Sequence, residues 1–191
     1  KKHLTMLSTH TTGIHYSDES VEWAVLRKNR GGIEKIKEEK LPNLPGFEPE
    51  KDGLCFPIEV LKHHRQTFKG MITVSLPSSH LLMRVMELPS TDPEELNGMV
   101  ELQLDQLSPF PLDQLTTSYE TLSQENGKSR VLAVTAQRKI IDRLGDQFKA
   151  EGIYIHSLDV EVLAWWSLLV THAKVPREGR VILLFEDHTE F

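Results

Sequence analysis

Few side chains in this sequence combine the residue types and the spacing that catalysis or metal binding requires. His63 and His64 are adjacent, and neighbouring residues on a helix point about 100° apart, so the two imidazoles do not converge on one metal ion. Cys55 is the only cysteine and has no evident paired base, so we expect a small buried residue rather than a nucleophile. Trp165 and Trp166 lack the basic neighbours that base stacking needs, which favours a core or interface role. The sequence therefore predicts no catalytic residue and no metal ligand.

An acidic cluster and an aromatic residue between two prolines lie at opposite ends of one predicted helix. Asp92, Glu94 and Glu95 begin this helix, where carboxylates accept the free N–H groups of the first turn and offset the helix dipole. The Pro-Phe-Pro segment 109–111 ends it, because proline has no N–H and clashes with the preceding turn. Two roles for Phe110 stay open: it fills a core, or it lines a binding groove.

Composition and charge exclude several classes of protein. The chain has 191 residues, 39% of them hydrophobic, which is enough for one sizeable core or two small lobes. Lys and Arg total 22 against 28 Asp and Glu, and a net charge of -6 disfavours general binding to nucleic acid. No apolar run approaches the roughly 20 residues of a membrane span, and the first residues have no signal-peptide pattern. We expect a cytoplasmic protein that contacts a membrane only through partners.

Hydrophobic periodicity predicts strands that alternate with helices, which favours an α/β class with mixed sheets. Asn126 and Gly127 predict a hairpin turn, because these residues adopt positive φ readily. The last predicted helix is apolar almost all round, so we expect it to be buried, with Trp165 and Trp166 not both exposed. The predicted strands are 13–16, 21–26, 33–41, 72–76, 82–88, 116–122, 130–136, 153–158 and 180–185, and the predicted helices are 57–68, 92–107, 139–151 and 159–170.

This order of elements resembles the actin-like (ribonuclease H-like) fold, and within it the PilM family of type IV pilus assembly proteins, which is related to the cytoplasmic domain of the type II secretion L protein. The segments that carry the resemblance are Val74-Ser75-Leu76-Pro77, Arg84-Val85-Met86-Glu87-Leu88-Pro89, Gln103 to Pro111, Ser118-Tyr119-Glu120, Glu151-Gly152-Ile153 and Leu158-Asp159-Val160-Glu161. The resemblance implies a first actin-like lobe (1–70 and 153–178), an inserted α+β subdomain (71–152), and the first strand of a second half (180–191).

The phosphate loops that actin-like ATPases share are altered in this sequence. Such enzymes carry Asp-x-Gly after a strand, where the aspartate organises magnesium and the glycine lets the backbone approach phosphate. Here His15 and Ser17 stand at the Asp and Gly positions of the first loop, and Phe185 and Asp187 at those of the second. We therefore predict no bound ATP or Mg²⁺ and no hydrolysis. The alternative is an actin-like ATPase with divergent phosphate loops.

The resemblance implies a non-catalytic cytoplasmic scaffold in a type IV pilus or type II secretion assembly. It would bind the N-terminal cytoplasmic tail of a single-span inner-membrane partner, in a groove between the main lobe and the inserted subdomain. Whether the chain also forms a homodimer is left open. The residues that we assign to the groove are Arg84, Met86, Gln103, Leu107, Phe110 and Leu112.

Overall fold

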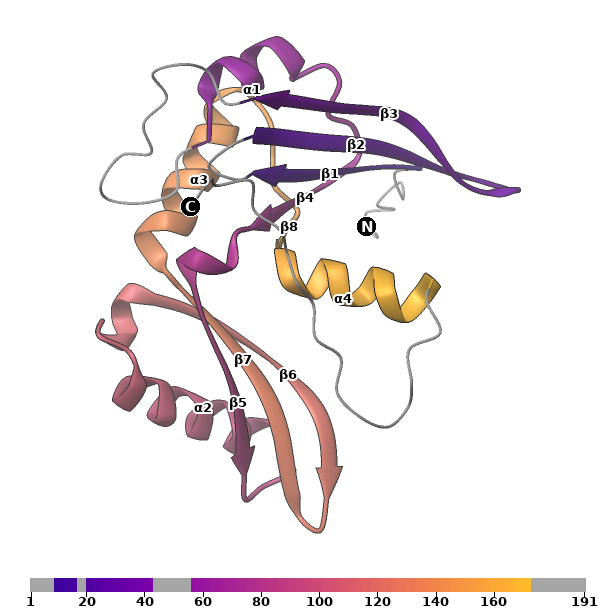
Figure 1. Ribbon diagram of the computed structural model, residues 1–191. Coiled ribbons are helices and arrows are strands. Elements are labelled where there is room, and N and C mark those ends of the chain that lie inside the picture. Colours follow the sequence, from indigo (N-terminus) through magenta and orange to yellow (C-terminus); the bar gives the residue numbers. More distant parts are fainter. Residues whose placement is uncertain (1–8, 17–19, 43–55, 173–191) are drawn as a thin grey trace, which may run out of the picture.

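A five-stranded mixed sheet forms the larger part of the molecule (Figure 1). The computed structural model describes residues 9–16, 20–42 and 56–172. Within these residues the sheet order is β3-β2-β1-β4-β8, in which the strands are β3 (Gly32–Pro42), β2 (Ser20–Asn29), β1 (His10–Tyr16), β4 (Met71–Leu76) and β8 (Ser157–Val160). The first three strands form the predicted antiparallel meander, whereas β4 runs parallel to both β1 and β8. The mixed α/β architecture is thus confirmed.

One face of this sheet is covered by two helices, α1 (Ile58–His64) and α3 (Arg138–Ala150). Successive side chains of a strand point to opposite faces, so alternate residues of β1, β2 and β4 enter one core with the apolar side of α3. In that core the Phe56 and Phe148 rings meet edge to face, with centroids 4.9 Å apart. We call the five-stranded sheet with its helices the main unit.

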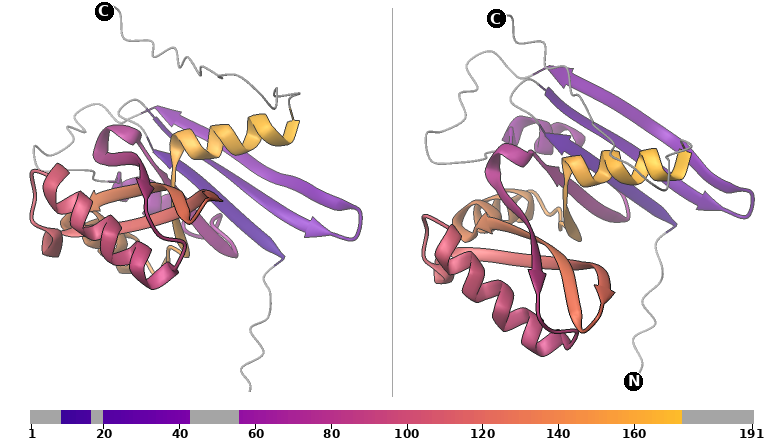
Figure 2. Two further views of the ribbon diagram at one scale, coloured as in Figure 1. Left: turned by 90° about the horizontal axis from the view of Figure 1, so that it is seen from below. Right: turned by 60° about the horizontal axis from the view of Figure 1, so that its bottom comes forward.

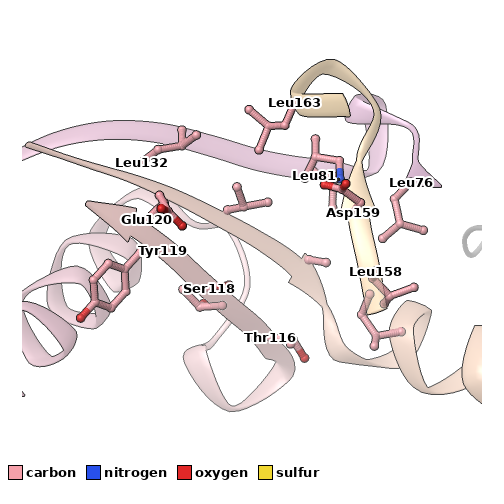
Figure 3. A pocket seen from close by; sticks show the side chains of 15 residues that line it. Leu76, Leu81, Thr116, Ser118, Tyr119, Glu120, Leu132, Leu158, Asp159 and Leu163 are labelled. Atoms are coloured by element: carbon pink, nitrogen blue, oxygen red, sulfur yellow. Dashed lines mark hydrogen bonds between the residues drawn. The ribbon is translucent and has the colours of Figure 1, made fainter. Parts of the chain in front are cut away.

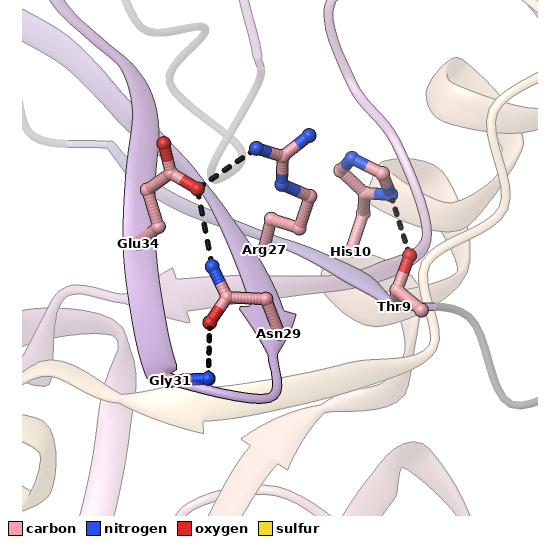
Figure 4. Close-up of polar contacts among 6 residues, drawn as sticks. All are labelled: Thr9, His10, Arg27, Asn29, Gly31 and Glu34. Atoms are coloured by element: carbon pink, nitrogen blue, oxygen red, sulfur yellow. Dashed lines mark hydrogen bonds and ion pairs between the residues drawn. The ribbon is translucent and has the colours of Figure 1, made fainter.

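The β2–β3 hairpin projects from the main sheet, and its turn is fixed by side-chain hydrogen bonds (Figures 1 and 4). The Asn29 amide oxygen accepts a bond from the Gly31 N–H at 2.9 Å. Glu34 accepts bonds from Arg27 at 2.8 Å and from Asn29 at 3.3 Å. These bonds join the strands across the tight turn that the glycines predicted.

A three-stranded antiparallel sheet forms the second part of the molecule, which we call the small unit. Its order is β5-β7-β6, in which the strands are β5 (Leu81–Leu88), β7 (Lys128–Gln137) and β6 (Leu115–Glu125). Asn126 and Gly127 join β6 to β7 with φ of 51° and 76°, so the predicted hairpin is confirmed. Short 3₁₀ turns precede β5 (Ser78–His80) and β6 (Leu112–Gln114).

Helix α2 (Pro93–Leu107) covers one face of the small sheet. The Asp92 carboxylate accepts bonds from the N–H groups of Glu94 (2.9 Å) and Glu95 (3.1 Å), as the acidic cluster predicted. The buried face of α2 packs on alternate residues of β5 and β7 to form a second core, made of Met86, Leu88, Leu96, Val100, Leu104, Val131 and Ala133. The two parts of the molecule therefore have separate hydrophobic cores.

The structure corrects the predicted limits of the inserted subdomain, 71–152. Strand β4 pairs with β1 and β8 in the main sheet, and α3 contributes Ile140, Leu144 and Phe148 to the main core. Only the elements from β5 to β7 build the second sheet and its core. The prediction was too wide because the apolar run of β4 does not indicate which sheet the strand joins. Residues 180–191, the predicted first strand of a second half, lie outside the described residues, as does Cys55.

The structure also corrects the predicted burial of the last helix, α4 (Glu161–His172), which has no buried residue. Trp165 is 47% exposed and Trp166 is 41% exposed, although we expected at least one of them to be buried. Figures 1 and 2 show α4 beside the main sheet, away from α1 and α3. Its apolar residues thus have no core to enter within the described part of the chain.

Candidate functional site

A groove lies between the small unit and the main unit, and we call it the interlobe groove (Figure 3). Its volume is about 260 Å³. One wall is the face of β6 and β7 that α2 does not cover, and the other wall comes from β8 and the start of α4. The lining residues are Leu76, Leu81, Thr116, Thr117, Ser118, Tyr119, Glu120, Leu132, Val134, Ala136, Ile141, Leu158, Asp159, Val160 and Leu163.

The small sheet lines this groove because it is apolar on both faces. In β7, Val131 and Ala133 point to α2, so the alternating residues Leu132 and Val134 point to the groove. Val85 of β5 lies beside Leu132 in the strand register, on the same face, and is 52% exposed. A sheet face that the described residues leave uncovered in this way favours a site that binds an apolar ligand.

A second hollow separates α4 from the uncovered face of the main sheet, with a volume of about 570 Å³. His15, at the end of β1, lines it, and the His15 Nε2 lies 3.7 Å from Glu161 Oε1. The charged residues in the lining besides these two are Glu22, Glu38, Glu39, Lys40 and Asp159. The Lys40 ammonium, 2.6 Å from Glu22, donates a hydrogen bond that lowers the pKa of that carboxyl. Carboxylates outnumber cations here, so the hollow repels a phosphate group that carries no bound cation.

Histidines 63 and 64 are separate in the structure, as the helix geometry predicted. The His64 ring lies tilted against the Trp23 ring, with centroids 4.6 Å apart, and its Nδ1 is 3.8 Å from a Glu39 oxygen. His63 Nδ1 lies 2.7 Å from the backbone oxygen of Glu59. Among the described residues, no three His, Cys, Asp or Glu side chains gather in a way that could hold a metal ion.

The residues that we predicted to bind a partner lie on the other side of the small unit. Met86 is 5% exposed and belongs to the core beneath α2, and Leu112 packs against that core. Arg84 alternates in phase with Met86 and is exposed, whereas Leu107 and Phe110 are exposed at the end of α2, at 50% and 39%. Gln103 lies on α2 itself. None of the six lines the interlobe groove described above.

Sequence reasoning missed the residues that do line the groove, although one signal was available. Strand 130–136 is apolar at odd and at even positions, which indicates a sheet covered on both faces. Since α2 covers only one of them, the other face needed a second partner. The residues that we predicted for the partner site instead lie on α2 or on the side of the small sheet where α2 packs.

The two sheets and their separate cores form a mixed α/β protein, as the resemblance to the actin-like fold predicted. The sequence model of the family "Type IV pilus assembly protein PilM" matches residues 50–184. The chain therefore belongs to the PilM family of type IV pilus assembly proteins. Among curated proteins, no relative matches the chain by sequence.

Two solved structures with a similar fold belong to a type IV pilus complex and to a type II secretion system. A structure of the PilM–PilN type IV pilus biogenesis complex has 16% identity and a TM-score of 0.70, over 84% of this chain and 50% of that one. The cytoplasmic domain of EpsL, an inner-membrane component of the type II secretion system of Vibrio cholerae, also has 16% identity, with a TM-score of 0.56 over 78% of this chain and 57% of that one. The chain thus spans about half the length of these structures. In its described part, no helix has the length and apolar character that a bilayer crossing needs.

Proposed function

We propose that this chain is a non-catalytic, cytoplasmic scaffold of a type IV pilus or type II secretion assembly, peripheral to the inner membrane. Its interlobe groove binds the N-terminal cytoplasmic segment of a single-span inner-membrane partner. The observation that carries this proposal is the groove itself, in which the aliphatic face of the small sheet lies opposite β8 and the start of α4. The similar structure of a PilM–PilN complex, in which a PilM protein is joined to a second protein, supports it.

The shape and chemistry of the groove suit an extended peptide. Aliphatic side chains such as Leu132, Val134 and Leu163 offer contacts for apolar anchors. Both β6 and β8 pair on one side only within the described residues, so backbone N–H and C=O groups beside the groove are available to fix the register of a peptide. A disordered membrane tail would gain order only where it contacts these walls.

The residues near the first phosphate loop support a role without nucleotide hydrolysis. Actin-like ATPases need a carboxylate at the end of β1 to organise magnesium, and this chain has His15 there. The hollow beside His15 is rich in carboxylates, which repel a phosphate group that carries no bound cation. The position that organises magnesium in actin-like ATPases holds a histidine, which supports a role without hydrolysis. An ATPase with divergent loops is the competing proposal, and an increase in Tm of the full-length protein with Mg·ATP would favour it.

Peptide binding to groove variants tests the proposal. The probe is a fluorescein-labelled synthetic peptide that copies the cytoplasmic N-terminal segment of a single-span inner-membrane protein, chosen from the reading frames next to that of this protein. Leu132→Glu puts a charge into the aliphatic wall, so we expect at least about a tenfold weaker affinity by fluorescence anisotropy. Leu102→Glu is the matched control, because Leu102 lies on α2, is 62% exposed and does not line the interlobe groove.

The two variants separate groove binding from other modes. Equal affinities for Leu132→Glu, Leu102→Glu and the parent would refute binding in the interlobe groove. Loss of affinity in Leu102→Glu alone would move the site to the α2 surface, near the residues first predicted. Circular dichroism of each variant confirms that the fold is retained before affinities are compared.

A further inference from the structure

The described residues that line the interlobe groove carry charge of one sign only. They include two carboxylates, Glu120 and Asp159, and no lysine, arginine or histidine. The remaining residues are aliphatic, hydroxyl-bearing or aromatic. Figure 3 shows Glu120 on the β6 wall and Asp159 on the β8 wall, so carboxylates lie on both sides. A ligand that fills the groove must therefore lie next to negative charge.

Of the two carboxylates, Glu120 is the one whose surroundings a bound ligand would change most. In the register of the small sheet it lies beside Leu132, which in turn lies beside Val85, so its neighbours across the sheet are aliphatic. Among the described residues, Glu120 makes no ion pair and no hydrogen bond through its side chain. Asp159 differs, because it accepts a bond from the Val160 N–H at 2.7 Å. Glu120 thus has its full bonding capacity available to a ligand.

We propose that the groove selects a peptide in which a lysine or arginine lies between apolar residues, with its cation against the Glu120 carboxylate. This inference rests on the proposed function, since it specifies the chemistry of the peptide that the groove binds. An apolar peptide without a cation would remove Glu120 from water and leave its charge unpaired, which is strongly unfavourable. A cation between apolar anchors satisfies Glu120 while the anchors contact the aliphatic wall.

The charge of the whole chain acts in the same direction. The formal net charge is -6, so a basic tail is attracted at long range and an acidic one is repelled. The same negative charge discriminates against peptides that are apolar but acidic. Glu120 then determines which of the attracted peptides fits at short range.

Glutamine substitutions on one strand test the proposal with the labelled peptide described above. Glu120→Gln keeps the size and removes the charge, and we expect about a tenfold weaker affinity. Glu125→Gln is the matched control, because Glu125 is an exposed residue at the far end of β6 and does not line the interlobe groove. We expect its affinity to stay within about twofold of the parent. The Glu120 effect should also shrink as salt is added.

A charge exchange identifies the pair. Each basic residue of the peptide is changed in turn to glutamate, and each peptide is measured with the parent and with Glu120→Lys. We expect one position at which the peptide binds Glu120→Lys better than it binds the parent, which is the signature of a direct contact. No such position, or a parental affinity in Glu120→Gln, overturns the proposal. If the parent binds no peptide at all, the proposed function fails instead, so the two failures are distinguishable.

Discussion

Two leucines of equal burial test whether the two hydrophobic cores unfold separately. Leu104 lies in the core of the small unit and Leu144 in that of the main unit, and both are 0% exposed. Changing either one to alanine removes apolar contacts and leaves a cavity, at a cost of about 2–5 kcal/mol. Because the residue type and exposure match, the two variants differ mainly in which core they weaken.

Native-state hydrogen exchange reports where each substitution acts. If the cores are separate cooperative units, Leu104→Ala should speed exchange of the β5, β6 and β7 amides and leave β1 and β2 close to the parent. A cost of about 3 kcal/mol corresponds to roughly two orders of magnitude in exchange rate. Leu144→Ala should speed exchange in β1, β2 and β4.

The opposite result has a clear form. If both variants speed exchange equally in both sheets, the molecule unfolds as one unit, and our division into two cores does not describe its stability. In that case the chain segments that connect the two sheets would couple their unfolding more tightly than the separate cores suggest.

Two further predictions concern single side chains. Phe110→Ala should leave Tm close to that of the parent, because Phe110 is 39% exposed. A weaker peptide affinity in this variant would support the assignment of Phe110 to the partner site. A large fall in Tm would instead show that Phe110 fills a core. Lys40→Met removes the hydrogen bond that lowers the pKa of Glu22, so it should destabilise the protein at neutral pH, with the difference fading as acid protonates Glu22 in the parent. Urea unfolding from neutral to acidic pH measures this difference in stability. A difference that grows on acidification would contradict a stabilising role for the Lys40–Glu22 hydrogen bond.

Local features of the fold could be predicted well from the sequence. The cap of α2 at Asp92, the hairpin at Asn126 and Gly127, and the end of α3 at Gly152, whose φ is 72°, each depend on a few neighbouring residues. Long-range pairing was harder to predict. Nothing in the local pattern of β4 indicates that it joins β1 rather than β5, since an apolar run fits either sheet.

The candidate site was predicted only in outline. The expectation of a groove between two units followed from the resemblance, but the choice of residues depended on strand phase. A shift of one position exchanges the faces of a strand, so Arg84 and Met86 point toward α2 whereas Val85 faces the groove side. The exposure of Trp165 was missed for another reason. An apolar helix indicates that some surface must cover it, but the pattern does not say whether the described residues supply that surface.

The outermost strand of the main sheet has a consequence for how the protein behaves in concentrated solution. Within the described residues, strand β3 pairs with β2 on one side only and would offer its other edge as a template on which further chains could stack into fibres. Six charged residues occupy this strand: Glu34, Lys35, Lys37, Glu38, Glu39 and Lys40. Ion pairs such as Lys37 with Glu39, at 2.9 Å, keep these charges at the surface. An arriving chain would have to bury them, so β3 acts as a barrier to aggregation.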